Sequence, residues 1–174
     1  MNFFIDKKIG MKNEIDGRII MNIILYQPEI PQNTGNIART CALTDTRLHL
    51  IKPLGFSLDE KHLKRAGLDY WDLLDLHIYE SFEDFSEKNP NIHLYILTTK
   101  AEKYYDAIDY DKDAFLMFGK ETAGIPSEIH EAYPGNRFRI PMRNHEKARS
   151  LNLSNAVNIV LFEALRQNDF QGLI

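Results

Sequence analysis

Apolar residues near the C-terminal end of the chain recur at the spacing of a helix. Counted from Leu153, they follow the i, i+3, i+4, i+7, i+8 series of a helix packed on a core: Leu153, Ala156, Val157, Val160, Leu161, Ala164 and Leu165. Ile159 and Phe162 fall on roughly the opposite face. A helix that is apolar on both faces is either central in a large core or covered by a partner. Because this chain is small, the pattern favours a homodimer interface.

Upstream of this helix, short apolar runs alternate with segments of helical character. Strands are predicted at 21–27, 48–52, 76–79, 92–97, 114–118 and 137–142. Helices are predicted from an N-cap at Asn33 or Thr34 to about Thr44, at 58–66, from Ser81 to about Lys88, and from Pro126 to about Tyr133. This alternation predicts an α/β fold with a mainly parallel sheet flanked by helices.

Ligands of such sheets bind at the carboxyl ends of the strands, where three loops are expected: 97–100, 119–124 and 140–150. The segment 118–126 is a glycine-bearing turn from a strand to a helix, and glycine permits positive φ and close approach of a ligand. Its spacing is neither that of a P-loop nor that of a dinucleotide fingerprint. Both a binding loop and an ordinary turn therefore remain open, and Glu121 could hold a ligand or cap the next helix.

Small polar groups gather where the first and last predicted helices begin. Ser150, Asn152 and Ser154 suit the binding of a ligand's heteroatoms, although plain N-capping would use the same residues. Asn33 stands six positions before Arg39, which could face the same loops. A lone helical arginine is more often a solvated or salt-bridged surface residue.

Composition narrows the functional classes. The 174 residues fit one domain, and no apolar run is long enough to span a membrane. The single cysteine, Cys41, fits a reducing cytoplasm and is interpreted as a buried apolar residue. Six scattered histidines lack metal-ligand spacing, which predicts no metal site. Residues 1–20 mix charged and apolar groups and are interpreted as an extension outside a single domain at 21–170: an appendage, a mis-assigned start or a disordered arm.

A net charge of −4 argues against a general nucleic-acid coat protein but leaves room for local basic patches. Two clusters are candidates for steering a polyanion: residues 61–65, and Arg137, Arg139, Arg143, Lys147 and Arg149.

Three segments, NTGNIARTC (33–41), LMFGKETAGIP (116–126) and IPM…RSLNLSNAV (140–157), resemble in this order the three motifs of the SPOUT superfamily of RNA methyltransferases. Within it the chain is most similar to the small TrmL/YibK-type tRNA 2′-O-methyltransferases, from about residue 21 to about residue 167. The resemblance implies a C-terminal trefoil knot, a cytoplasmic homodimer, and S-adenosylmethionine (SAM) bound bent in the knot. One departure is that the stretch between Met142 and Ser150 is about two residues longer than the family pattern.

The resemblance also implies the reaction and its residues. The ribose 2′-hydroxyl of wobble nucleotide 34 in a tRNA anticodon stem-loop, in leucine isoacceptors, would be methylated, with S-adenosylhomocysteine as the second product and no metal. SAM would contact Leu97, Gly119, Ile140, Ser150 and Leu151. The active-site positions would be Asn33, Arg39, Glu121, Ser150 and Asn152. We hypothesise that Arg39 orients the hydroxyl and a nearby phosphate and stabilises developing alkoxide charge, because an arginine is a poor proton acceptor.

Three other interpretations remain. The same chemistry could act on another tRNA or rRNA position, and the isoacceptor, the base at position 34 and the need for prior modification stay open. A non-catalytic SAM- or RNA-binding protein could share the fold. A flavodoxin-like module would fit the strand and helix alternation but leaves the segment SLNLS unexplained.

Overall fold

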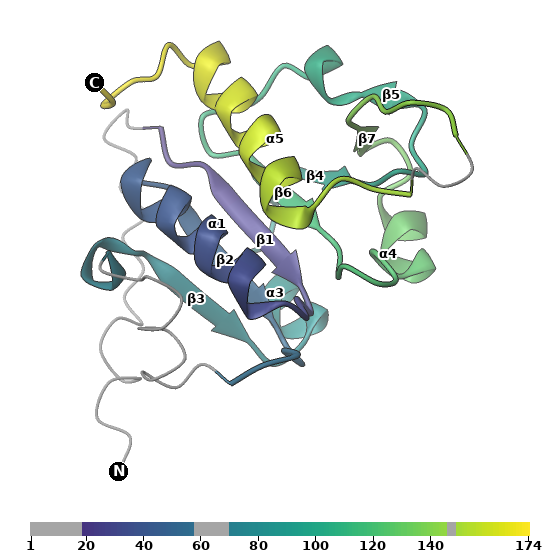
Figure 1. Ribbon diagram of the computed structural model, residues 1–174, viewed down its shortest axis with the longest axis horizontal. Helices are drawn as coiled ribbons and strands as arrows, with labels where there is room; N and C mark the ends of the chain where they lie inside the picture. The colour runs from purple at the N-terminus through teal and green to yellow at the C-terminus, as the bar shows by residue number, and fades with distance from the viewer. Residues whose placement is uncertain (1–18, 58–69, 146–148) are drawn as a thin grey trace.

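The computed structural model describes residues 19–57, 70–145 and 149–174, which form a seven-stranded sheet flanked by helices (Figure 1). Every strand pairing is parallel, and the strand order is β3-β2-β1-β6-β4-β7-β5. The strands are β1 Asn22–Tyr26, β2 Arg47–Ile51, β3 Leu76–Tyr79, β4 Leu94–Leu97, β5 Lys103–Tyr104, β6 Phe115–Phe118 and β7 Arg137–Arg139. The prediction of an α/β fold with a parallel sheet is confirmed, whereas the implied trefoil knot is not tested by the strand order and stays a prediction.

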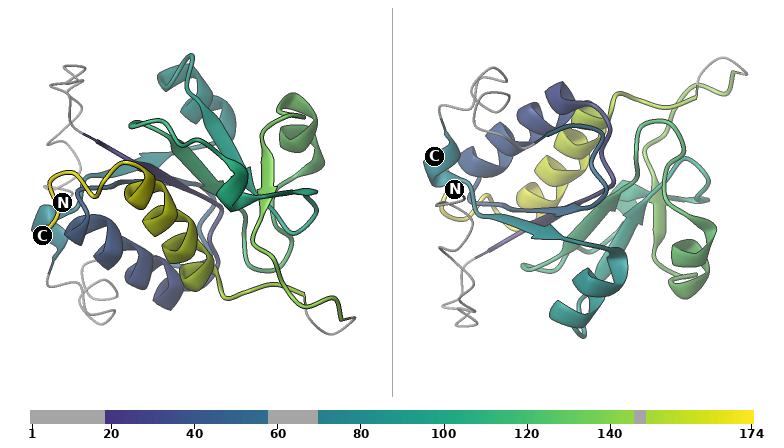
Figure 2. Two further views of the ribbon diagram at one scale, coloured as in Figure 1. Left: turned by 90° about the horizontal axis from the view of Figure 1, so that it is seen from above. Right: turned by 90° about the horizontal axis from the view of Figure 1, so that it is seen from below.

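Helices cover both faces of the sheet, which makes a three-layer sandwich (Figure 2). The helices are α1 Pro31–Leu43, α3 Phe82–Lys88, α4 Ser127–Ala132 and α5 Leu153–Gln167. Alternate residues of β1 divide between the two cores, as the period of a strand requires. Ile23 and Leu25 pack in the cluster that contains α1 and α5, whereas Ile24 packs in the cluster of α3 and α4. Within the described ranges, every helix is too short or too polar to cross a membrane.

The last helix has the predicted register. Leu153, Val157, Val160, Leu161, Ala164 and Leu165 are all buried. Ile159 and Phe162 lie on the other side, 38% and 47% exposed. Helix α5 packs beside α1 on the same face of the sheet (Figures 1 and 2). The helix therefore keeps an apolar face that this chain alone leaves open.

Several boundaries differ from the predictions for local reasons. Helix α1 begins at Pro31 with Ile30 at its N-cap, so the prediction that Asn33 or Thr34 caps it is wrong. Proline is favoured at the first helical position, and this places Asn33 inside the first turn, 5% exposed. Pro126 stands at the N-cap of α4, one position before the helix. The basic segment 58–66 lies outside the described residues.

At the N-terminal end of the described residues, Ile19 packs in the core and the Ile20 backbone N–H donates to the carbonyl of Lys112.

Three short elements had no counterpart in the sequence pattern: strand β5 and the 3₁₀ turns at Trp71–Leu73 and Tyr105–Ala107.

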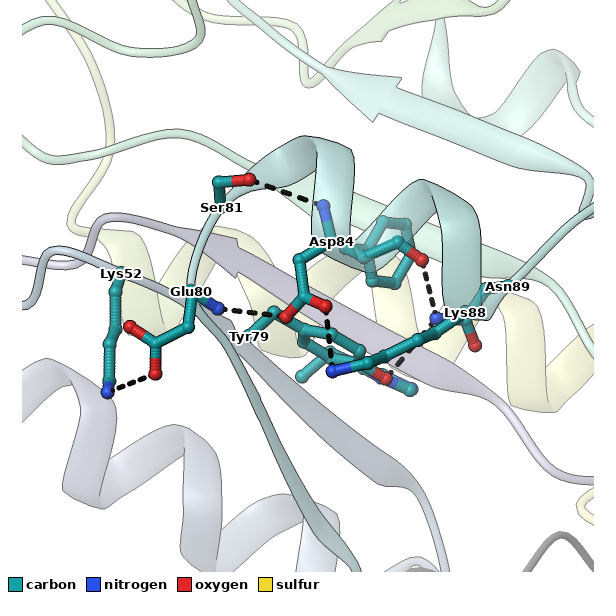
Figure 3. Close-up of polar contacts among 9 residues, drawn as sticks. Lys52, Tyr79, Glu80, Ser81, Asp84, Lys88 and Asn89 are labelled. Atoms are coloured by element: carbon teal, nitrogen blue, oxygen red, sulfur yellow. Dashed lines mark hydrogen bonds and ion pairs between the residues drawn. The ribbon is translucent and has the colours of Figure 1, made fainter.

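The short helix α3 depends on the predicted cap at Ser81 (Figure 3). Ser81 Oγ accepts from the Asp84 backbone N–H at 3.2 Å, and Asp84 Oδ2 accepts from the Glu80 N–H at 3.0 Å. Asp84 also pairs with Lys88 one turn later, at 2.7 Å. Exposed ion pairs of this kind stabilise little, so the capping bonds decide where this seven-residue helix starts.

A buried histidine joins the three strands on one side of the sheet. Asn22 donates through Nδ2 to two carbonyls, so its Oδ1 accepts from Nε2 of His49 at 3.1 Å. Nδ1 of His49 then accepts from the Tyr79 hydroxyl at 3.0 Å. Burial lowers the pKa of His49 to about 3; His77 and Arg47 add to this effect, and Asp75 opposes it. His49 is therefore a structural residue that links neighbouring strands of the sheet.

The neutral His49 makes stability depend on pH. The imidazole binds a proton below about pH 6.5 only when the chain is unfolded, so stability falls as pH falls below that value. Between about pH 7 and about pH 5 the loss from this residue is about 2 kcal/mol. We expect urea unfolding of a His49→Gln variant to show a smaller loss over this interval than the parent chain, even if the variant is less stable overall. Equal losses would contradict this assignment.

Candidate active site

The candidate site lies at the carboxyl end of the sheet, where β1 and β6 are neighbours (Figure 1). The strands that follow β1 in the chain, β2 and β3, lie on one side of it, and β6 and β4 lie on the other. Such a reversal of strand order is where open α/β sheets bind ligands. The loop 27–30 after β1 and the loop 119–126 after β6 therefore leave the sheet side by side.

A continuous chain of hydrogen bonds joins the three sequence motifs at this edge. Asn33 Nδ2 donates to Glu121 Oε1 at 2.9 Å, and Asn152 Nδ2 donates to Asn33 Oδ1 at 2.9 Å. Asn152 is the N-cap of α5, and its Oδ1 accepts from Ser154 N at 3.0 Å and from Ser154 Oγ at 2.7 Å. These contacts link residues 88 and 119 positions apart in the chain.

The direction of each bond in this chain is determined by its two ends. An ionised carboxylate can only accept, and the N–H groups at the start of a helix can only donate. Asn33 must therefore turn its NH₂ toward Glu121, which leaves its oxygen for Asn152. Asn152 must turn its NH₂ toward Asn33, which leaves its oxygen for the first turn of α5. A reversal of either amide would set donor against donor or acceptor against acceptor.

Glu121 also caps the first helix from a distant loop. Its carboxylate accepts from the backbone N–H groups of Glu29 at 2.9 Å and Ile30 at 3.3 Å, and Ile30 is the N-cap of α1. Helix α1 has no side-chain cap of its own and no acidic residue in its first turn. A carboxylate at this end is favoured by the helix dipole. Of the two roles suggested by the sequence, capping is thus observed, but on α1 rather than on the helix that follows Glu121.

The glycines of the 119–126 loop are required by the loop itself. A Cβ on Gly119 would lie 2.2 Å from the carbonyl carbon of Gly124, so a side chain there would collide with the backbone of the same turn. Gly124 has φ of +72°, and its N–H donates to the Lys120 carbonyl at 2.9 Å. Packing within the turn therefore requires glycine at position 119, and the expected contact of Gly119 with a ligand stays a prediction.

The residues expected around SAM come from neighbouring strands. Leu97 is the last residue of β4 and pairs with Phe118 on one side and Phe138 on the other. Gly119 and Ile140 directly follow β6 and β7, so all three lie at the carboxyl ends of neighbouring strands. Leu97 is buried, Ile140 is partly buried, and Leu151 is 39% exposed. Within the described part of the chain, residues 140–144 and 149–151 make no backbone–backbone hydrogen bond. Apolar side chains beside open backbone donors and acceptors suit an adenine ring.

Arg39 and Ser150 stand apart from the hydrogen-bonded chain. Arg39 is exposed on α1, and its guanidinium carbon lies 5.0 Å from the centre of the Tyr70 ring. This cation–π contact orients the guanidinium, and among the described residues none accepts a hydrogen bond from its N–H groups. Ser150 is exposed two residues before the N-cap of α5. Among the active-site candidates, the fold thus joins Asn33, Glu121 and Asn152 directly.

An arginine-lined pocket of about 520 Å³ lies beside the segment that follows β7. Arg139, Arg143 and Arg149 contribute to it, with Tyr104 on another side. Three of the five members of the second basic cluster therefore do meet around one hollow. Tyr104 belongs to β5, which the sequence pattern had not indicated, and its 52% exposed ring could be found only from the structure.

Metal-ligating and nucleophilic groups are the last candidates. Among the described residues, no three His, Cys, Asp or Glu side chains are grouped as metal ligands. Cys41 is fully buried, and burial raises the pKa of its thiol, which confirms its interpretation as an apolar residue of the core.

Asn152 has two roles: it caps α5 and it donates to Asn33. Substitutions at this position can test the two roles separately. In an Asn152→Asp variant the cap survives, but a carboxylate oxygen faces Asn33 Oδ1, so we expect a loss of about 1 kcal/mol near neutral pH. The loss should fade as the carboxyl is protonated below about pH 4, because a protonated carboxyl can donate to Asn33. Asn152→Ser is the control. Serine can cap the helix through its single oxygen but has no carboxyl group to ionise, so the stability of this variant should lack this pH dependence. Urea unfolding measures both; an Asp variant as stable as the parent near pH 7 would contradict the bond directions.

Known proteins resemble this chain in sequence and in fold. A Yersinia pestis protein named tRNA (cytidine(34)-2′-O)-methyltransferase is 48% identical over 162 residues, which cover 89% of this chain and 98% of that protein. A solved structure described as giving structural insights into the 2-OH methylation of C/U34 on tRNA is 41% identical, with a TM-score of 0.80 and coverage of 86% of this chain and 97% of that one. An AdoMet-bound rRNA methyltransferase from Sinorhizobium meliloti is 27% identical, with a TM-score of 0.73, and covers 84% of this chain and 56% of its own.

The profile of the SpoU rRNA Methylase family matches residues 20–162, a span that contains all three motifs and both ends of the hydrogen-bonded chain. The sheet, the linked motifs and this match lead to one conclusion: the chain belongs to the SpoU rRNA Methylase family.

Proposed function

We propose that the protein transfers a methyl group from SAM to the ribose 2′-hydroxyl of wobble nucleotide 34 in tRNA, with leucine isoacceptors as substrates. The observation that carries this proposal is the hydrogen-bonded chain Glu121–Asn33–Asn152, which joins three motifs at the edge of the sheet where ligands bind. The name of the Yersinia pestis relative and the description of the C/U34 structure support nucleotide 34 as the target.

The loops after β4, β6 and β7 hold the methyl donor in this proposal. When bound, SAM supplies an electrophilic methyl group on a sulfonium sulfur. Leu97, Ile140 and Leu151 provide apolar contacts, and the open backbone groups of 140–144 and 149–151 provide hydrogen bonds. The AdoMet-bound relative from Sinorhizobium meliloti supports the use of this cofactor in the family.

The hydrogen-bonded chain sets the distance between the two reacting groups. Asn152 starts α5 and ends the donor-binding segment, whereas Asn33 belongs to the helix that carries Arg39. Holding an attacking oxygen at about 3–3.5 Å from the carbon it attacks accounts for much of an enzyme's acceleration. Fixed amide orientations in a partly buried network provide rigidity of this kind. In this proposal the hydrogen-bonded chain acts on the reaction by holding the first and third motifs in a fixed relative position, through Glu121, Asn33 and Asn152.

Arg39 supplies positive charge to the acceptor side. A ribose 2′-hydroxyl is a poor nucleophile at neutral pH. As its oxygen bonds to the methyl carbon, S-adenosylhomocysteine would leave and the hydroxyl proton would pass to solvent, so that negative, alkoxide-like charge develops on the oxygen. An exposed guanidinium fixed against Tyr70 can hydrogen-bond both this oxygen and the adjacent phosphate. The pocket of Arg139, Arg143 and Arg149 adds positive charge beside the donor segment, where a phosphodiester backbone would be attracted.

The active unit in this proposal is a cytoplasmic homodimer. Ile159 and Phe162 on α5 and Leu43 on the adjacent α1 are 38%, 47% and 52% exposed, which leaves an apolar surface on the paired helices. Such a surface is expected to be covered. Light scattering should give a mass of two 20.3 kDa chains; a single-chain mass at micromolar concentration would contradict the dimer.

The function is tested by transfer of labelled methyl from SAM to total tRNA, with mapping of the modified nucleotide. We expect label at the 2′-oxygen of nucleotide 34 in leucine tRNAs. Label at another ribose would keep the reaction and reject the substrate position. Binding of SAM without any transfer to RNA would reject the enzyme and favour a non-catalytic binding protein.

Arg39→Ala is expected to lower kcat roughly 100-fold, because it removes charge that stabilises the attacking oxygen. Arg39→Lys keeps the charge but loses the planar fork, so an intermediate rate is expected. Because Arg39 is not among the residues expected to contact SAM, calorimetric affinity for SAM should change little in either variant. Full turnover by Arg39→Ala would remove Arg39 from the mechanism.

A further inference from the structure

Glu29 lies in the loop after β1, and neither the resemblance nor the sequence pattern assigns it a role. Its carboxylate accepts from the backbone N–H of Thr122 at 3.0 Å and from the Thr122 hydroxyl at 2.8 and 3.0 Å. Its own backbone N–H donates to Glu121 at 2.9 Å. The two loops thus exchange carboxylates: Glu121 binds the backbone before α1, and Glu29 binds the backbone just after Glu121.

We propose that Glu29 is a positioning residue for the methyl transfer, which acts through Thr122 on the orientation of Glu121. The inference rests on the proposed function for its kinetic consequence. Its structural part is that Glu29 keeps the hydrogen-bonded chain well ordered, from Glu121 through Asn33 to the start of α5.

The backbone of Glu29 is itself anchored from a third loop. Gly55 N–H donates to the Pro28 carbonyl at 2.9 Å, and a Cβ on Gly55 would lie 2.7 Å from Glu29 Cα. Lys120 Nζ donates to Gln27 Oε1 at 3.1 Å, which adds a further bond between the loop after β1 and the loop after β6. Because its main chain is held in this way, the side chain of Glu29 transmits a fixed position to Thr122 and does not merely follow it.

The bond to Thr122 bears directly on Glu121. The Thr122 N–H belongs to the peptide plane that follows Glu121, so holding that N–H fixes the backbone rotation of Glu121. The Glu121 carboxylate can then meet its three donors at Glu29, Ile30 and Asn33 together. Thr122 is exposed and Glu29 is only partly buried, so loss of their contact should cost little global stability and act mainly on alignment.

The chemistry of the contact provides a matched pair of variants. A glutamine at position 29 can still accept from the Thr122 N–H through its oxygen and can donate through its NH₂ to the Thr122 hydroxyl, which accepts as well as donates. Glu29→Gln therefore keeps the contact without the charge, whereas Glu29→Ala removes both. Thr122→Val removes the hydroxyl bonds and keeps the N–H.

The first readout is steady-state kinetics with SAM and tRNA. We expect Glu29→Ala to lower kcat about tenfold or more, since small misplacements of reacting groups are costly, with KM for tRNA changed less than about twofold. Glu29→Gln should recover most of the rate. The double variant Glu29→Ala/Thr122→Val should be no slower than Glu29→Ala alone, because the two residues act as one unit. An unchanged kcat for Glu29→Ala, or equal losses for the Ala and Gln variants, would overturn the proposal.

The second readout does not need activity, so it separates failure of this inference from failure of the proposed function. Backbone amide exchange in Glu29→Ala should accelerate at Thr122 and also at Ser154 and Asn155, whose N–H groups end the hydrogen-bonded chain. Exchange in Glu29→Gln should match the parent. Acceleration confined to Thr122 would show that Glu29 does not reach α5 and would overturn the positioning role. If Glu29→Ala does not fold, Glu29→Met takes its place in both measurements, because it keeps the bulk of the side chain but lacks the carboxylate oxygens that accept from Thr122.

Discussion

The directional chain from the Glu121 carboxylate through Asn33 and Asn152 to the first turn of α5 is the constraint on which the site depends. Its two ends cannot change roles, because one can only accept and the other can only donate. Two amides between such ends have one arrangement that satisfies both. The structure therefore holds two helices and a loop, distant in sequence, in one relative position by polar contacts, while apolar packing supplies most of the stability.

The parallel sheet is what brings this constraint together. With β1 and β6 adjacent at the reversal of strand order, the loops that leave them can exchange backbone and side-chain contacts. Gly119 and Gly124 allow the second loop to fold on itself, and Glu121 then supplies the cap that α1 lacks. These contacts form one structural unit: the cap of α1, the tight turn and the link to α5. A change in any one of them should therefore alter the other two.

The site combines a buried, hydrogen-bonded interior with accessible charged groups on its surface. Asn33 is buried and hydrogen-bonded through both its NH₂ and its oxygen, as a group that fixes geometry should be. Arg39, and Arg143 and Arg149 in the pocket after β7, are exposed, as groups that meet a polyanion should be. In the proposed function, these arginines give a chain of net charge −4 a local positive surface for RNA beside the reacting edge.

The sequence by itself determined the α/β class, the positions of most strands, the cap of α3 and the core face of α5, because each follows from local periodicity and capping chemistry. Local signals failed at the start of α1, where the cap comes from Glu121, 91 residues away along the chain. They also gave no role to Glu29 and no sign of β5, whose two residues become a strand only by pairing with β7. Partners remote in the chain leave no periodic trace, so only the tertiary structure decided which polar residues meet.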